Sequence, residues 1–185
     1  AHNAKIIIVG DLTFQHAKTI SDKLVTSLSE GKVQPLTFDS PKIKAQTIQV
    51  DFPATQKNIR IGALGIARKN PDFLPLKVGN YILGGDSLSS MLGKMVRETK
   101  GLTYGIYSYF SAPVNPGPFI ISFSSSKNKA TSAMTLTRKI LSQYIHDGPT
   151  KAQLQFAKDY MLGSFPLKLD SNSKILANVS NIASF

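Results

Sequence analysis

Residues 88–110, with the sequence LSSMLGKMVRETKGLTYGIYSYF, join an amphipathic helix to an aromatic strand. Apolar residues recur at helical spacing in the first part, at Leu88, Met91, Leu92, Met95 and Val96. Gly101 stands where a helix can end through a left-handed residue. The aromatic residues that follow predict a strand over residues 103–111. A helix that leads closely into a strand favours a sheet with helices packed on it.

The rest of the chain adds strands and helices in separate runs. We predict further strands at residues 5–10, 45–52, 58–66 and 119–126. Residues 119–126 are expected to form a hairpin with 103–111. We predict helices at residues 14–28, 74–83 and 130–145, and from a capping box at Thr150 and Gln153 onward. Because strands and helices do not alternate strictly along the chain, we favour an α+β fold, with a mainly antiparallel sheet and helices packed on one face.

The predicted elements suggest a division of the chain. We expect residues 1–31 to form a strand–helix unit, residues 32–44 to form a linker that carries two prolines, and residues 45–185 to form the main domain. The chain begins with Ala1 rather than Met, and helical spacing of apolar residues continues to Phe185. We therefore expect a piece of a longer polypeptide.

Composition narrows the classes of function. The net charge is +11, which is compatible with a solvated lysine-rich surface or with a nucleic-acid-binding module. The lysines are spread along the chain without a dense basic tract, and this favours the solvated surface. The absence of cysteine excludes disulfides and thiolate catalysis, and is compatible with a periplasmic or other exported compartment. No apolar run approaches the roughly 20 residues of a membrane-spanning helix.

Few residues are suited to catalysis. The three histidines, His2, His16 and His146, form neither H-E-x-x-H nor H-x-x-E-H, so we expect no metal site in this chain. Arg97 and Tyr104 have two interpretations. The arginine can complement a helix dipole while the tyrosine packs in a core, or the pair can hold a peptide carbonyl, because guanidinium and phenol groups donate hydrogen bonds.

Several motifs resemble one family. Residues 83–92 read LGGDSLSSML and residues 97–108 read RETKGLTYGIYS. These segments, in this order, resemble the second half-domain of pitrilysin/insulinase-type metallopeptidases, the inverted-zincin superfamily that includes mitochondrial processing peptidase. Residues 5–11 and 149–158 follow the family pattern too, so the resemblance covers nearly the whole chain. The sequence departs from that pattern at Asp86, Met91 and Gln153.

The resemblance implies a fold and a role. The fold is the LuxS/processing-peptidase-like half-domain, with residues 1–31 resembling the end of the preceding half-domain and residues 45–185 forming a non-zinc half truncated at its C-terminus. Arg97 and Tyr104 would hold a peptide substrate and support the oxyanion. Zinc would lie in an H-x-x-E-H half-domain, in the same polypeptide or a partner subunit, so this chain should be inactive alone. The alternative within the family is a non-catalytic scaffold subunit.

Overall fold

The protein was analysed as a computed structural model, which describes residues 4–29, 31, 43–112 and 114–184. The chain divides into two compact units, one made of Ala1–Asp39 with Met161–Phe185 and the other of Ser40–Tyr160. Most of the predicted linker lies outside the described residues. The predicted division into residues 1–31, 32–44 and 45–185 stays a prediction.

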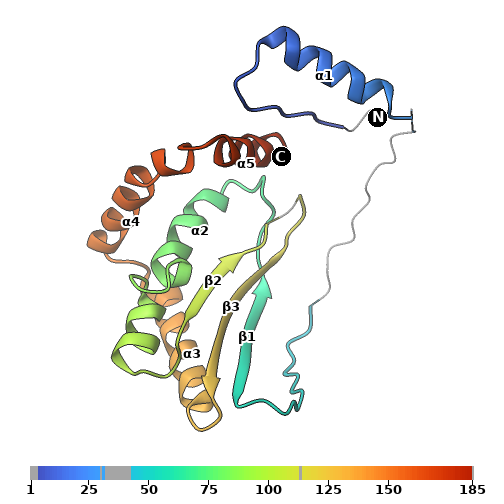
Figure 1. The fold of residues 1–185 in the computed structure, drawn as a ribbon. Coiled ribbons are helices and arrows are strands. Elements are labelled where there is room, and N and C mark those ends of the chain that lie inside the picture. The colour runs from blue at the N-terminus through green and yellow to red at the C-terminus, as the bar shows by residue number, and fades with distance from the viewer. Residues whose placement is uncertain (1–3, 30, 32–42, 113, 185) are drawn as a thin grey trace. The chain divides into compact units, whose positions relative to one another are not determined.

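The unit of Ser40–Tyr160 contains an antiparallel sheet of β1 (Gln56–Leu64), β2 (Ile106–Phe110) and β3 (Pro118–Ser126) (Figure 1). Its spatial order is β1-β3-β2, with Ile61 opposite Ile121 and Ile106 opposite Phe123. The predicted hairpin between β2 and β3 is confirmed. The predicted strand at residues 58–66 begins and ends two residues earlier, as β1.

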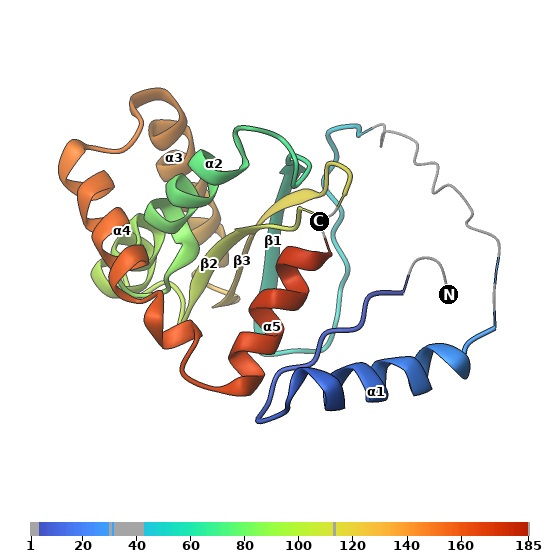
Figure 2. The same cartoon turned by 90° about the horizontal axis from the view of Figure 1, so that it is seen from above.

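Helices of the same unit cover one face of this sheet (Figures 1 and 2). They are α2 (Phe73–Asn80), which continues into the π-helical η1 (Tyr81–Gly85), then the π-helical η2 (Gly93–Thr99), and α3 (Ala130–Asp147). Alternate residues of β3 point toward them, and these join helix residues in one core made of Leu83, Leu92, Val96, Ile106, Ile121, Phe123, Ala133 and Ile140. The predicted α+β fold with helices on one face is confirmed.

The helix predicted from Leu88 begins later, at Met91. Ser90 is buried, and its hydroxyl accepts a hydrogen bond from the Gly93 amide at 3.1 Å, so Ser90 caps the helix. Leu88 therefore lies in the preceding turn and is exposed. Within η2 the wider π-helical turn changes the spacing of the buried side chains, so Val96 is fully buried while Met95 is 40% exposed.

Two predicted strands are not formed. Residues 5–9 and 45–52 form neither helix nor strand in the structure. Both segments have the alternating or apolar character of strands, but a strand requires backbone pairing with a neighbour, and no described strand pairs with either. The side chains of Ile48, Val50 and Phe52 are accordingly exposed.

The described residues of the other unit form helices and irregular segments, and no strand. α1 (Phe14–Thr26) is capped by Thr13, whose hydroxyl accepts from the His16 amide at 3.3 Å. The apolar side chains of Phe14, Ile20, Leu24 and Val25 along this helix are exposed. The short η3 (Pro166–Lys168) precedes α5 (Asn172–Ala183), and the Lys5 ammonium donates to the Ala183 carbonyl.

α4 (Lys151–Gly163) begins with the predicted capping box. The Thr150 amide donates to the Gln153 side chain at 2.8 Å, and the Gln153 amide donates to the Thr150 hydroxyl at 3.2 Å. Two backbone N–H groups at the start of α4 that have no partner within the helix are thus hydrogen-bonded. Among the described residues, no helix has the length and hydropathy needed to cross a membrane.

Gly93 permits the close approach of η2 to the turn before it. A Cβ atom added there would lie 2.4 Å from the Ser87 carbonyl oxygen, which is backbone and cannot move aside cheaply. We expect Gly93→Ala to lower the free energy of unfolding by about 1–3 kcal/mol, as overpacking does. Gly163→Ala is the control, because a Cβ atom there meets nothing within 4 Å. Equal urea-unfolding midpoints for the two variants would contradict the expectation.

Candidate functional site

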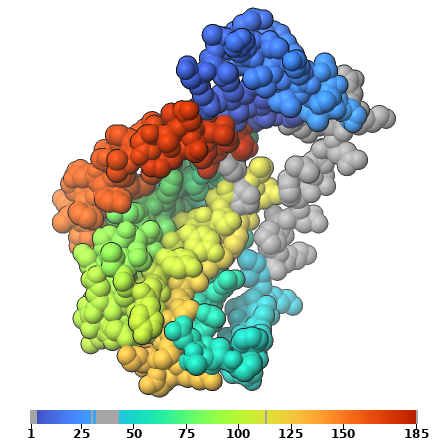
Figure 3. Space-filling model, viewed as in Figure 1, coloured from blue at the N-terminus to red at the C-terminus, as the bar shows by residue number. Residues whose placement is uncertain are grey.

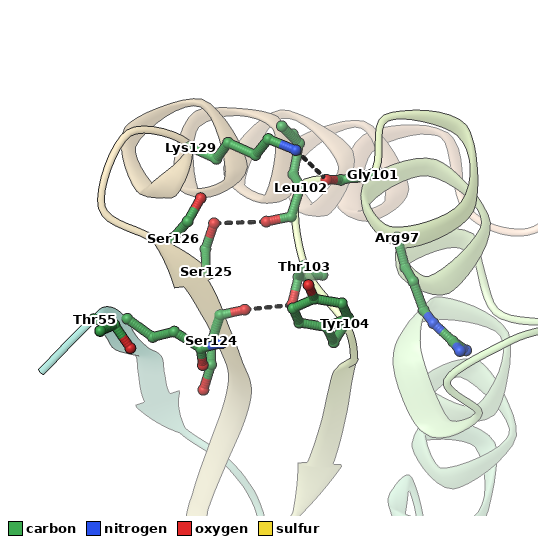
Figure 4. A pocket seen from close by; sticks show the side chains of 11 residues that line it. Thr55, Arg97, Gly101, Leu102, Thr103, Tyr104, Ser124, Ser125, Ser126 and Lys129 are labelled. Atoms are coloured by element: carbon green, nitrogen blue, oxygen red, sulfur yellow. Dashed lines mark hydrogen bonds between the residues drawn. The ribbon is translucent and has the colours of Figure 1, made fainter.

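Arg97 and Tyr104 line one open hollow of about 530 Å³ in the unit of Ser40–Tyr160. Arg97 lies in the last turn of η2, and Tyr104 lies in the segment between η2 and β2. Figure 4 shows the Tyr104 ring between Ser124 of β3 and Arg97. The structure therefore brings the two residues selected from the sequence to one site, from neighbouring elements.

Gly101 turns the chain from η2 toward this site. Its φ is +56°, the left-handed conformation predicted for it from the sequence. The Gly101 amide donates to the Arg97 carbonyl at 3.0 Å, and the Leu102 amide donates to the Val96 carbonyl at 2.9 Å. These bonds close the end of the helix and send residues 102–105 along the end of β3.

Side chains hold the segment on both sides of Tyr104. The β2–β3 ladder starts only at Ile106, so residues 101–105 do not pair with β3 through their backbone. Instead the Thr103 hydroxyl lies 2.6 Å from the Ser124 carbonyl oxygen and 2.8 Å from the Gly105 carbonyl oxygen, and it can donate to either. The Ser125 hydroxyl donates to the Leu102 carbonyl at 2.6 Å (Figure 4). The backbone beside Tyr104 is thereby fixed.

A lysine adds a third tether. The Lys129 ammonium donates to the Gly101 carbonyl at 3.0 Å, and both residues line the hollow (Figure 4). Sequence reasoning missed Thr103, Ser125 and Lys129. The signal that could have drawn attention to them is the run of three serines that ends β3, followed by a lysine-rich turn at residues 127–129. Their partners are carbonyl groups 21 to 28 residues away, so only the fold pairs them.

The Tyr104 side chain itself is available. It is 87% exposed, and no described group forms a hydrogen bond with its hydroxyl. This excludes the interpretation of Tyr104 as a core residue. The Arg97 guanidinium makes one long contact, from Nη1 to the Ser87 carbonyl at 3.5 Å, and no described carboxylate pairs with it. Both groups can therefore donate to a ligand.

The lining of the hollow is positively charged. It contains the cationic side chains of Arg97 and Lys129, the hydroxyls of Thr103 and Tyr104, and no carboxylate. Such a set can donate hydrogen bonds to carbonyl oxygens or to a developing negative charge. It offers no nucleophile paired with a base.

The residues present do not fit a metal ion. Within the described ranges, no group of three or more histidine, cysteine, aspartate or glutamate side chains is placed to hold one. His16 lies in α1 and His146 in α3, in different units of the chain, and His2 lies outside the described residues. Any zinc chemistry therefore has to come from residues outside those described here.

Asp86 organises the turn that precedes η2. Its Oδ1 atom accepts from the Ser89 amide at 2.7 Å and from the Leu88 amide at 2.8 Å. The bond from Ser89 is the largest influence that lowers the pKa of the Asp86 carboxyl below its ordinary value, while partial burial opposes it. Asp86, one of the positions where the sequence departs from the family pattern, therefore caps the turn that follows it. This turn includes Ser87, whose carbonyl Arg97 contacts.

Comparison with known proteins identifies the family. The peptidase M16 inactive domain matches residues 1–161. The chain belongs to this family. A crystal structure of a peptidase M16 inactive domain from Pseudomonas fluorescens is 30% identical, with a TM-score of 0.86, over 95% of this chain and 41% of that chain. The resemblance to the non-zinc half-domain of these metallopeptidases is confirmed.

Two curated relatives carry different names. A Bacillus subtilis protein named uncharacterized zinc protease YmxG is 29% identical over 95% of this chain and 42% of its own length. A Helicobacter pylori protein named non-peptidase homolog YmxG is 28% identical over 95% of this chain and 41% of its own length. This M16 inactive domain therefore spans about two fifths of the relatives that it matches.

Thr103 should matter for stability as well as for the site. Thr103→Val keeps the shape but leaves the Ser124 carbonyl without its hydroxyl donor, so we expect the free energy of unfolding to fall by about 1–3 kcal/mol. Thr135→Val, on the exposed side of α3, is the matched control and should change it little. The measurement is urea unfolding, and equal effects of the two substitutions would contradict the tether.

The Asp86 cap predicts a pH dependence. A carboxyl whose pKa is lowered by folding stabilises the folded state above its ordinary pKa, and this contribution is lost as the pH falls through the lowered value. We expect Asp86→Asn to reduce stability at pH 7 by on the order of 0.5 kcal/mol, since the carboxylate is mostly solvated. The difference from wild type should shrink as the pH falls below about 3.9 and close only below the lowered pKa of the folded state. Urea unfolding over a series of pH values from 7 downward tests this, and a difference that stays constant across the series would argue against it.

Proposed function

We propose that this M16 inactive domain is the substrate-holding half of a zinc endopeptidase. The observation that supports this best is the convergence of Arg97 and a highly exposed Tyr104 on one hollow whose lining carries no carboxylate. The H-x-x-E-H half-domain, in the same polypeptide or a partner subunit, would bring zinc and the attacking water. The name of the Bacillus subtilis relative, a zinc protease, is in keeping with this division.

The residues of this chain would act on the peptide by position and charge. The Arg97 guanidinium can donate several hydrogen bonds to carbonyl oxygens of an extended substrate. The Tyr104 hydroxyl can donate to the oxygen that becomes negatively charged when the carbonyl is attacked. The tethers from Thr103, Ser125 and Lys129 limit movement of the Tyr104 backbone, so little reorganisation is needed as that charge develops.

A non-catalytic assembly role is the second candidate. The observation in its favour is the name of the Helicobacter pylori relative, a non-peptidase homolog that also matches 95% of this chain. Under this alternative the exposed Tyr104 and Arg97 would contact a partner surface, and the complete protein would cleave no peptide. Turnover by the full-length protein together with its zinc-bearing half separates the two candidates.

Removal of one hydroxyl tests the first candidate. In the full-length assembly, we expect Tyr104→Phe to lower kcat by about 10²–10³-fold with little change in KM, the effect of losing one oxyanion donor. Folding should be unchanged because the side chain is 87% exposed. Tyr160→Phe is the control, since this tyrosine stacks on Tyr81 away from the hollow. Unchanged turnover in Tyr104→Phe would count against the mechanism.

A further inference from the structure

The face of the sheet that turns away from the core carries a continuous polar and aromatic surface. Strand alternation places Ile121 and Phe123 in the core, so the residues between and beside them point the other way. We call this the outer sheet face, and its polar and aromatic residues include Asn58, Arg60, Tyr107, Tyr109, Ser122 and Ser124. Gly62, Leu64 and Ile120 continue the same face toward the other end of β1 and β3. In Figure 3 the yellow atoms of β2 and β3 lie at the molecular surface.

Side-chain contacts confirm that these residues share one face. The Ser124 hydroxyl donates to the Asn58 side-chain oxygen across β3 and β1. The rings of Tyr107 and Tyr109 stack with centroids 6.3 Å apart along β2, and they are 49% and 40% exposed. The surface is therefore built from interacting side chains, and its aromatic rings remain accessible to a ligand.

Arg60 supplies the charge of the outer sheet face. It is exposed, and no described carboxylate lies within ion-pair distance of it. None of the outward positions of the three strands is aspartate or glutamate. A cation without a counter-charge on its own face is complementary to an anionic group from a ligand.

The neighbours of Arg60 specify the kind of anion. The register places Arg60 opposite Ser122 and Ser122 opposite Tyr107, so one cross-strand row combines a guanidinium with two hydroxyl groups. Neighbouring strands lie about 4.8 Å apart, so the row extends over about 10 Å. Guanidinium and hydroxyl donors together suit a carboxylate, which accepts through two oxygens. The stacked tyrosines beside the row suit the extended backbone and apolar parts of a peptide.

The row lies close to the proposed site along the chain. Tyr107 follows Tyr104 by three residues, so their Cα atoms lie no more than about 10 Å apart. An extended peptide covers the same distance in about three residues. A substrate whose carbonyl is held at Tyr104 can therefore place a side chain at the Arg60 row.

We propose that the outer sheet face binds the substrate beside its scissile bond and selects a glutamate or aspartate side chain about three residues away, through Arg60 with Ser122 and Tyr107. This inference rests on the proposed function, because it extends the substrate path from the Arg97–Tyr104 hollow. It assigns specificity to residues that do not touch the reacting carbonyl. The occupant is an acidic segment of an extended peptide.

Binding of matched peptides tests the proposal. The full-length assembly is titrated with dye-labelled peptides of alanine and serine around one leucine, identical except for a single Glu or Gln. We expect the Glu peptide to bind about tenfold more tightly by fluorescence anisotropy, the difference that a charge-assisted hydrogen bond supplies. Arg60→Gln should remove this preference without changing the Kd of the Gln peptide, and Tyr107→Phe should reduce it. Arg138→Gln, an exposed arginine on α3, is the charge-matched control.

The outcomes separate this inference from the proposed function. Equal affinity for the Glu and Gln peptides in the wild-type protein, or no binding of either, would overturn the inference. So would a preference that survives Arg60→Gln. The proposed function is judged apart from this, by the turnover that Tyr104→Phe loses on the Gln peptide. A Glu preference that depends on Arg60, in an assembly that cleaves nothing, would uphold the outer sheet face and reject the peptidase role.

Discussion

The hydrogen bonds between the end of β3 and the segment ahead of β2 hold the candidate site in place. Thr103 donates to the Ser124 carbonyl, and Ser125 donates to the Leu102 carbonyl. Because the backbone ladder stops at Ile106, these side-chain bonds take over where strand pairing ends. Tyr104 can therefore face solvent while the residues on both sides of it stay fixed. In a regular strand the same fixing would come from backbone pairing instead.

The two faces of the sheet carry different kinds of side chain. One face of β3 contributes Ile121 and Phe123 to an apolar core covered by helices, and this burial supplies the main driving force for folding of the unit. The opposite face carries hydroxyl groups and Arg60, and the adjoining hollow carries Arg97. Under the proposed function this rigidity matters, because the contribution of a hydrogen-bond donor depends on its position rather than on a reactive group.

The local sequence pattern was enough to predict the elements whose stabilising contacts come from residues close in sequence. The hairpin of β2 and β3, the helix α3 and the capping box at Thr150 formed as expected, because their stabilising contacts are close in sequence. Residues 45–52 alternate like a strand but have no partner among the described strands, and pairing cannot be read from one segment alone. The helix that leads into η2 was predicted to begin at Leu88 but begins at Met91, because the buried Ser90 caps it.

The sequence by itself determined the fold class, because apolar periodicity is a property of neighbouring residues. Its motifs carried the resemblance to the family, and that resemblance made Arg97 and Tyr104 the candidates for the site. Only the tertiary structure decided that Tyr104 is exposed rather than buried and that Thr103, Ser125 and Lys129 hold its segment. The physical reason is that exposure and hydrogen bonding depend on groups more than twenty residues apart. The register of β1, β3 and β2 likewise placed Arg60 beside Ser122 and Tyr107, a juxtaposition that no local pattern encodes.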